Sequence, residues 1–576
     1  MIKPMCLLFA SLALTATTCF SQATTQKSKK EKELTQTQLT WLNDLRVLET
    51  DSTKIEGPLG RALAKTEIAA AAWDLDKKWS KELLQNAYEL TFPDDDEQAR
   101  LRQRPAGSPP LLPTSVDRAR NAIVHRVLQV AGRDRTFADS LLQLSKDKLG
   151  TYDAHLRYTT LASQAFNDGD KDRARSLLLS AIDADPTQIT AGLVIRDIAT
   201  HDRALADELI IQYIDRLRAF PLSSENQSLV RVFFTLSGFV FPQSTPDRQV
   251  TPPGAAVMRT YIGYVIDTVT KLESDPAYLQ AANAILISTW PLLKSYAPDL
   301  IGVFSSLEQR SLTSGTSRLQ KADSVDEMYR AYKARNDQRI NNSLESDKPD
   351  EAVITLAINQ LDFAKARKMI DKLTERDQKT KLSELVNLRE ALALVAKDDI
   401  PTAQGLAERL NDATSILKVY PVIVSKCVSE KNQDCVSDAV LQAMKKLKKA
   451  NNKMPTPPTG LPTSSMPDEQ EVDPVLLSLS KLAELISPVN EQLAWDVLNE
   501  VVQSANRSKL DTSQGHIGFE PNVFRRLSER DDARTYQVAN ELKDRLERIV
   551  ALANIYQGLS DREKKASSSQ KIRGQL

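Results

Sequence analysis

A short pattern recurs along much of this chain: an acidic or amide residue, a small residue four positions later, and an apolar residue eight positions later. We call the first position the Asp column. Its clearest members are Asp134, Asp170, Asp202, Asp362, Asp399 and Asp531, and Asp76 and Asn490 fit less closely. Where units adjoin, the column advances by 36 residues (134 to 170), 32 (170 to 202) and 37 (362 to 399). Steps of this length fit a helix, a turn and a second helix.

Helix physics gives each position of the pattern a meaning. Asp or Asn at a helix start accepts a hydrogen bond from a backbone N–H that has no partner within the helix. The fourth and eighth residues after it share one helical face, and a small residue at the fourth position lets another helix approach closely. Glycine is scarce at 18 residues and aromatic residues make up 6%, which also favours helices over sheets. The sequence therefore predicts an all-α fold of stacked antiparallel helical hairpins, an α-α superhelix or solenoid.

One unit, residues 155–188, resembles a known repeat family. Its core reads YTTLASQAFNDGDKDRARSLLLSAIDADP. Eight of its positions carry residue types that the tetratricopeptide repeat accepts: Tyr158, Leu161, Ala162, Ala165, Ala174, Leu178, Ala181 and Pro186. Two of these are substitutions, Tyr158 for the usual tryptophan and Ala165 for the usual tyrosine. The resemblance implies a superhelix of paired helices that binds proteins or peptides, and the weaker units elsewhere are similar to it only in the Asp column.

The first 23 residues read MIKPMCLLFASLALTATTCFSQA, with one basic residue, a short apolar core and a small-x-small sequence at Ser21–Ala23. This arrangement is typical of a secretory signal peptide. The alternative is a lipoprotein signal that modifies Cys19, although Ala16 to Thr18 is a poor approach to such a cysteine. No later stretch reaches the length of apolar sequence that a membrane-spanning helix needs. We therefore expect an exported chain, periplasmic or secreted, with no transmembrane segment after signal removal.

Proline-rich and polar stretches divide the rest of the chain, because proline cannot occupy a helix interior without cost. The expected order is a signal peptide (1–23), a disordered arm (24–38), an N-terminal repeat array (39–241), a central helical region (256–345), a second repeat array (349–451), a Pro-rich linker (452–474), C-terminal helical hairpins (475–558) and a polar tail (559–576). Whether residues 216–345 continue the repeat is left open by their pattern.

Charge and motif content argue against several classes of function. The chain has 76 Lys plus Arg and 76 Asp plus Glu, so its balance gives no electrostatic case for nucleic acid. The four histidines are His125, His155, His201 and His516. None lies three or four residues from another, and phosphate-binding glycine loops and nucleophile elbows are absent from the sequence. The sequence assigns no catalytic residue, no cofactor and no metal ligand.

Two cysteines would remain after signal removal, Cys427 and Cys435 in KCVSEKNQDCV. Cys435 lies 36 residues after Asp399 and has Ala439 and Ala443 at the fourth and eighth following positions. This spacing predicts that Cys435 takes the Asp-column position of a hairpin. Two thiols without histidine make a poor zinc site, and a spacing of eight is not that of CxxC redox proteins. In an exported chain the pair indicates a disulfide, which would stabilise the fold by about 2.5 kcal/mol.

Three hypotheses about function follow from the sequence. The leading one is an exported helical-repeat protein that works without catalysis as a scaffold for a protein or peptide partner of unknown identity. The second is an enzyme whose site is assembled from dispersed helical residues. The third is a structural component of a cell-envelope assembly. Fold alone does not separate them, because function depends on sites.

Overall fold

We describe the protein from a computed structural model. It describes residues 33–93, 115–149, 154–186, 189–219, 253–272, 292–294, 296–303, 306–307, 325–346, 349–451, 474–508 and 510–573, together with the single residues 236, 285 and 289. Every regular element in these ranges is helical, so the all-α prediction is confirmed.

The helices of the first half are α1 (Gln36–Ser52), α2 (Pro58–Ala72), α3 (Lys77–Leu90), α5 (Ser115–Ala131), α6 (Arg135–Leu149), α7 (Ala154–Asn167), α8 (Lys171–Ala184), α9 (Ile189–Ala199), α10 (Arg203–Ala219) and α12 (Ala255–Leu272). A short 3-10 turn, η2 (Pro298–Leu300), follows. The helices of the second half are α15 (Val325–Glu345), α16 (Glu351–Asn359), α17 (Phe363–Asp371), α18 (Arg376–Val395), α19 (Ile400–Ala407), α20 (Ala413–Ser429), α21 (Gln433–Asn451), α22 (Pro474–Ile486), α23 (Glu491–Ala505), η3 (Thr512–Gln514), α24 (Asn522–Ser528), α25 (Asp532–Asn540) and α26 (Arg545–Arg573).

All eight members of the Asp column cap the second helix of a hairpin. In each, a side-chain oxygen accepts the backbone N–H three residues later, at 3.0–3.3 Å. The small residue four positions after each cap is fully buried: Ser80, Ala138, Ala174, Ala206, Ala366, Ala403, Ala494 and Thr535. The pattern was therefore a correct guide to both the turn and the helix contact.

The unit that resembles the tetratricopeptide repeat is the hairpin of α7 and α8, whose helices pack closely together. Seven of its eight matching positions are buried and Tyr158 is half-buried. Asp170 caps α8, and the preceding Gly169 adopts a positive φ of 83° that turns the chain between the helices. The structure thus supports a helical repeat protein, with these residues forming the contact between paired helices.

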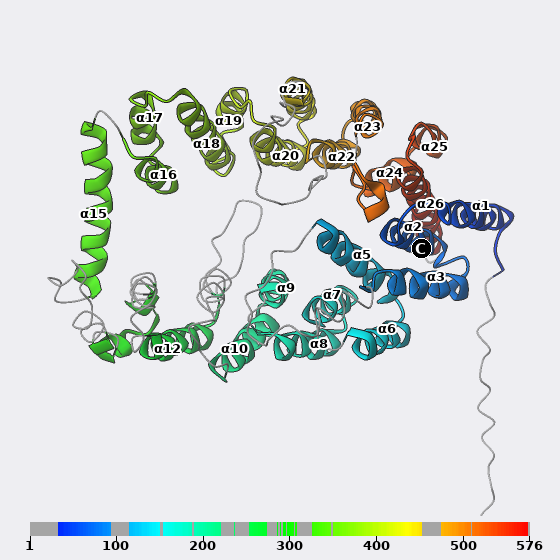
Figure 1. The fold of residues 1–576 in the computed structure, drawn as a ribbon, viewed down its shortest axis with the longest axis horizontal. Helices are drawn as coiled ribbons and strands as arrows, with labels where there is room; N and C mark the ends of the chain where they lie inside the picture. Colours follow the sequence, from blue (N-terminus) through cyan, green and yellow to red (C-terminus); the bar gives the residue numbers. More distant parts are fainter. Residues whose placement is uncertain are drawn as a thin grey trace, which may run out of the picture.

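The hairpins stack into two layers that run along two facing rows (Figure 1). The first helices of the hairpins form the inner layer and the second helices the outer layer. The inner helices are α2, α5, α7 and α9 in one row, and α16, α18, α20, α22 and α24 in the other. Each inner helix packs against the inner helix of the next hairpin in its row, so the inner layer is continuous along each row.

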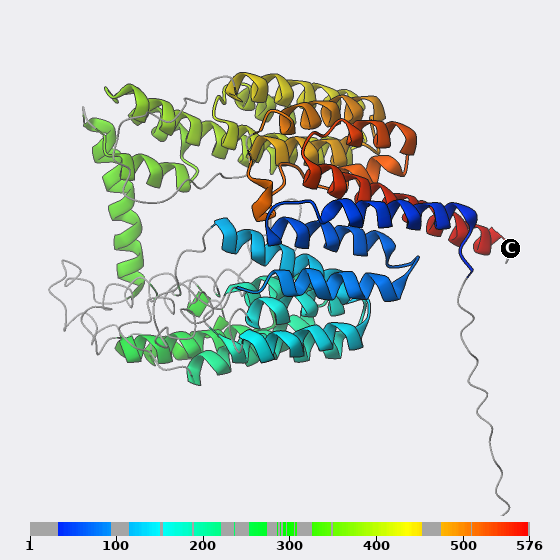
Figure 2. The same ribbon diagram turned by 45° about the vertical axis from the view of Figure 1, so that its right-hand side comes forward.

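The two rows join where the ends of the chain meet. Figure 2 shows the C-terminal helix α26 beside α1 and α2, and α26 packs against both of them as well as against α24 and α25. The inner layer therefore continues from α24 through α26 to α2 and α5. Helix α1 lies outside α26, so α26 and α1 together occupy the place of one hairpin, with its two helices drawn from opposite ends of the chain.

The core is continuous through this junction. One hydrophobic cluster extends from Leu45 in α1 to Leu559 in α26, and a second cluster joins α15 to α18. Helix α26 approaches α24 too closely at Gly558 for a side chain to fit, because a Cβ there would lie 2.3 Å from the backbone oxygen of Arg525. Helix α26 runs to Arg573, so helical residues occupy much of the range predicted as a polar tail (559–576). The predicted linker (452–474) and the predicted signal peptide (1–23) lie outside the described residues, except for Pro474 at the start of α22.

Candidate functional site

The inner layer offers one continuous surface, and α20 shows how its side chains are arranged. Ile416, Val419, Ile423 and Cys427 are fully buried, whereas Thr414, Lys418 and Ser425 are exposed. Spacings of three and four residues place the buried set on one face of α20 and the exposed set on the opposite face. Because the buried face packs against the outer helix α21 and the neighbouring inner helices, the exposed face points away from α21, toward the other row.

The other inner helices in the row of α16 to α24 also have a buried face and an opposite, exposed face. The exposed charged side chains on the corresponding faces of the inner helices are Lys381 and Arg389 on α18, Lys418 on α20, Lys481 on α22 and Arg526 on α24. Half-buried apolar side chains lie between them and pack against the core: Leu385, Leu392, Leu417, Val422 and Leu485. We call this surface, formed by α18, α20, α22 and α24, the inner face.

Counter-charges on the inner face are fewer than the cations. Lys381 lies 3.4 Å from Glu351 of α16, and Arg526 lies 3.7 Å from Glu484. Glu384 of α18 lies instead beside Lys446 of the outer helix α21, and its Oε1 accepts the backbone N–H groups of Asn411 and Asp412. Glu520 interacts electrostatically with Lys481. The exposed cations on these helices therefore still outnumber their acidic neighbours.

The junction of the two chain ends contains a buried polar cluster. Arg126 of α5 donates to both carboxylate oxygens of Glu67 in α2, at 2.6 and 2.9 Å. Asn554 and Gln557 of α26 donate to the same carboxylate, each at 3.1 Å. Burial alone would raise the pKa of Glu67, but Arg126 and the two amides outweigh it and hold that pKa below its usual range. The cluster fastens α2, α5 and α26 to one another.

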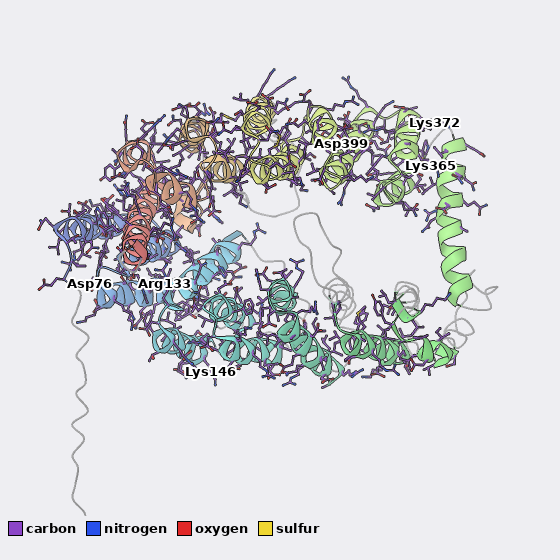
Figure 3. The ribbon with its side chains drawn as sticks, turned by 180° about the vertical axis from the view of Figure 1, so that it is seen from behind. Asp76, Arg133, Lys146, Lys365, Lys372 and Asp399 are labelled. Atoms are coloured by element: carbon purple, nitrogen blue, oxygen red, sulfur yellow. A yellow bond between two sulfur atoms is a disulfide. The ribbon has the colours of Figure 1, made fainter. Side chains whose placement is uncertain are left out.

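Further polar contacts cross the junction nearer the surface. Tyr556 of α26 donates to Asp44 of α1 at 2.9 Å, and Gln38 of α1 donates to Glu563 at 2.7 Å. Lys564 pairs with Asp74, which follows α2, at 2.6 Å. Figure 3 shows Arg133, at the end of α5, beside α26 at this end of the molecule. These contacts bind α1, α2 and α26 together along the length of the C-terminal helix.

Glu547, near the start of α26, is a buried carboxyl group whose pKa is raised, unlike that of Glu67. Only 2% of it is exposed, and its Oε1 accepts the backbone N–H of Gly518 at 2.9 Å. Burial raises the pKa of Glu547 to about 7, the Gly518 hydrogen bond lowers it in part, and the charge of Asp544 raises it further. This carboxyl group therefore changes charge near neutral pH, inside the joined core.

An open depression of about 460 Å³ lies on the outer side, between α1 and α3. The Arg46 guanidinium lies 5.7 Å from the centre of the Trp79 ring and 3.5 Å from Asp76. Glu49 pairs with Lys65 at 2.9 Å. Since Asp76 also caps α3, these groups serve the packing of α1 on the first hairpin.

The two cysteines lie where α20 turns into α21, with Sγ atoms 1.93 Å apart and Cα atoms 5.7 Å apart. The predicted role of Cys435 as the Asp-column residue was wrong. Asn432 caps α21 instead, because its Oδ1 accepts the N–H of Cys435 at 3.1 Å. Lys431 before it has a positive φ of 56°, as Leu361 and Asp398 have before their caps. Capping needs an oxygen acceptor, which asparagine has and cysteine lacks.

The cysteine pair gives a direct chemical prediction. When the native chain without residues 1–23, which contain Cys6 and Cys19, is unfolded without reductant and titrated for thiols, we expect Cys427 and Cys435 to be unreactive, because the two sulfurs form a disulfide across the corner. After reduction, two thiols should appear. A Cys427→Ser variant supplies the control, since it should show one thiol before reduction. Two reactive thiols in the unreduced native chain would contradict the disulfide.

The sequence predicts no metal ligands among the histidines. His125 Nδ1 lies 2.9 Å from Thr160 Oγ1, and burial lowers the pKa of His125. In the part of the chain that the structure describes, no group of three His, Cys, Asp or Glu side chains is placed to hold a metal ion. Over the same residues, none of the helices combines the length and apolar character that crossing a membrane requires.

Together these features define a helical repeat protein in which stacked hairpins close on themselves through both chain ends. No protein family model matches the chain, and no curated protein sequence matches it. Among solved structures, a "Circular tandem repeat protein with novel repeat topology and enhanced subunit contact surfaces" aligns over 92% of this chain and 99% of its own. The alignment has 12% sequence identity and a TM-score of 0.12, and it carries no information about function.

Proposed function

We propose that this protein is an exported, non-catalytic scaffold that binds a protein or peptide on its inner layer. The supporting observation is the inner layer itself: successive first helices pack side by side and leave one face of each exposed. Stacked helical hairpins offer an extended surface of this kind, which suits a polypeptide better than a small molecule. The polar cluster of Glu67 and Arg126 contributes by holding the two rows in a fixed arrangement.

Export is part of this proposal. It is supported by the signal-like sequence of residues 1–23 and by the cysteine pair, because disulfides persist mainly outside the cytoplasm. The thiol titration described above tests this part, provided that the chain is purified from its native cells.

Site-specific photo-crosslinking tests the binding surface. A photo-reactive residue would replace Lys418 of α20 or Leu193 of α9, both exposed on inner helices, in the full-length chain expressed in its native cells. The matched controls replace Leu441 or Lys449, which are exposed on the outer helix α21. We expect one discrete crosslinked product of the same partner mass from both inner positions and none from the outer ones. Equal crosslinking from the outer positions, or none from the inner ones, would refute the inner layer as the binding surface.

A further inference from the structure

The inner face carries exposed positive charges on successive helices, and the spacing of those helices has consequences for a ligand. Lys381, Lys418 and Lys481 are exposed on three successive inner helices, α18, α20 and α22, which pack side by side. Neighbouring packed helices lie about 8–10 Å apart, and an extended chain covers about 3.3–3.6 Å per residue. A peptide that crosses the helices would therefore advance by about three residues from one helix to the next.

Apolar side chains accompany these charges on the same helices. Leu385, Leu417 and Leu485 are half-buried, with one side packed on the core. Leu385 and Leu485 lie one helical turn after Lys381 and Lys481, and Leu417 directly precedes Lys418. Their free sides offer shallow apolar contacts beside the cations, so a ligand that matched both features would combine carboxylates with apolar residues.

The backbone of α20 adds a hydrogen-bond acceptor at the same place. Pro421 lies inside α20 and has no N–H, so the carbonyl of Leu417 lacks the donor that a continuous helix would supply. Leu417 and Pro421 are half-buried and flank Lys418 on the exposed face. A backbone N–H of an extended peptide could donate to this carbonyl, whereas the N–H groups in the interior of a helical peptide are already paired.

From these observations we propose that the inner face of α18, α20 and α22 binds an extended acidic peptide segment of a partner protein, with a carboxylate at about every third residue. The argument is charge complementarity. Five cations are exposed on the inner face, Lys381, Arg389, Lys418, Lys481 and Arg526. Fewer acidic groups lie near them: Glu351 is 3.4 Å from Lys381, Glu484 is 3.7 Å from Arg526, and Glu520 interacts electrostatically with Lys481. This inference rests on the proposed function and specifies the class of its partner.

The test uses the full-length chain and a fluorescein-labelled nonapeptide with glutamate at positions 1, 4 and 7 and leucine or valine between. Fluorescence anisotropy should show saturable binding that weakens as salt rises, since exposed charge pairs are screened. Two peptides of the same composition or length serve as controls, one with the three glutamates adjacent and one with glutamine in their place. We expect both to bind at least tenfold more weakly.

Variants of the protein locate the contact. Lys418→Glu combined with Lys481→Glu should weaken binding at least tenfold, whereas Lys445→Glu combined with Lys449→Glu, on the outer face of α21, should change it less than twofold. All four lysines are exposed, so thermal unfolding should be nearly unchanged in both pairs. Pro421→Ala restores the N–H to α20 and should weaken binding several-fold while raising the unfolding temperature, a combination that a purely structural role would not produce.

Two results would overturn the inference. Equal affinity for the peptide with adjacent glutamates would show nonspecific attraction to negative charge, and unchanged affinity of the Lys418 and Lys481 double variant would place the contact elsewhere. If the peptide fails to bind while the inner crosslinks succeed, the partner is not acidic and only this inference fails. If the inner crosslinks fail as well, the proposed function fails with it.

Discussion

Replacing Arg126 with alanine is expected to lower the free energy of unfolding by about 3–5 kcal/mol, because it leaves the buried Glu67 carboxylate without its counter-charge. Glu67 is only 3% exposed and receives both of its ionic hydrogen bonds from Arg126. The amides of Asn554 and Gln557 remain, but they donate without charge. Urea denaturation followed by circular dichroism measures the loss.

An exposed ion pair on α26 provides the control that separates the effect of burial from that of removing an arginine. Arg562 of α26 lies 3.1 Å from Asp532, and both side chains are more than two-fifths exposed. Arg562→Ala should cost about 1 kcal/mol or less. A double change of Glu67 and Arg126 to methionine should recover much of the loss seen with Arg126→Ala, since it removes the uncompensated charge. If Arg126→Ala costs no more than Arg562→Ala, the cluster does not hold the junction.

The pH dependence of the Arg126→Ala loss has a definite sign. In the native chain the pKa of Glu67 is held below its unfolded value, so its contribution is present above the unfolded pKa and is lost as pH falls through the folded one. Without Arg126, burial dominates and the pKa of Glu67 rises. The Glu67 carboxyl of the variant then protonates as the pH falls. The difference in the free energy of unfolding between the native chain and Arg126→Ala should therefore become smaller toward acid pH.

Replacing Glu547 with glutamine is expected to raise stability at pH 8 and to leave it almost unchanged at pH 4. Burial raises the pKa of Glu547 from 4.5 to about 7. A raised pKa means that its favourable contribution is full below pH 4.5 and is lost as pH rises through 7. The loss amounts to about 3 kcal/mol by pH 8, from 1.36 kcal/mol per pKa unit. Glutamine keeps an oxygen for the Gly518 N–H and carries no charge.

Unfolding free energies of both chains at pH 4, 6 and 8 test this expectation. The native chain should lose stability relative to Glu547→Gln across this range, with the steepest change between pH 5 and 7. Glu541→Gln provides the control, because Glu541 is exposed just before α26 and should leave the profile of the native chain unchanged. Parallel profiles for the native chain and Glu547→Gln would mean that Glu547 stays ionised when buried.

The local parts of this fold were predictable from the sequence. Asp170 caps α8 and Ala174 is buried one turn later, because the chemistry of a helix start and the spacing of a helical face are both written in neighbouring residues. The prediction failed at Cys435. It relied on the spacing of 36 residues from Asp399 and ignored that a helix cap needs an oxygen acceptor, which cysteine lacks. Asn432, three residues earlier, was the signal that could have corrected the prediction.

The junction was not predictable in this way. Glu67 and Asn554 meet across 487 positions of sequence, and no local pattern links a single buried glutamate in one helix to an amide in another. Most residues of α2 are buried, and the only sign of this in the sequence was its run of alanines, whose small side chains allow neighbouring helices to pack closely. The inner face could not be predicted from the sequence either, because its prediction requires knowing which helix of each hairpin lies in the inner layer. The sequence around Lys418 and Lys481 does not relate the two residues, which come onto adjacent helices only because α20 and α22 pack together.

The shared hairpin of α26 and α1 sets an order on how the chain can acquire its native state. Helix α1 is synthesised long before α26, since Asp44 and Tyr556, which contact each other, lie 512 residues apart. Until α26 is made, the faces of α1 and α2 that it covers have no partner, and contacts between such distant segments form slowly. A nascent chain therefore stays short of its final structure until α26 has been synthesised. Synthesis of α26, rather than formation of any single hairpin, is the step that allows the closed form.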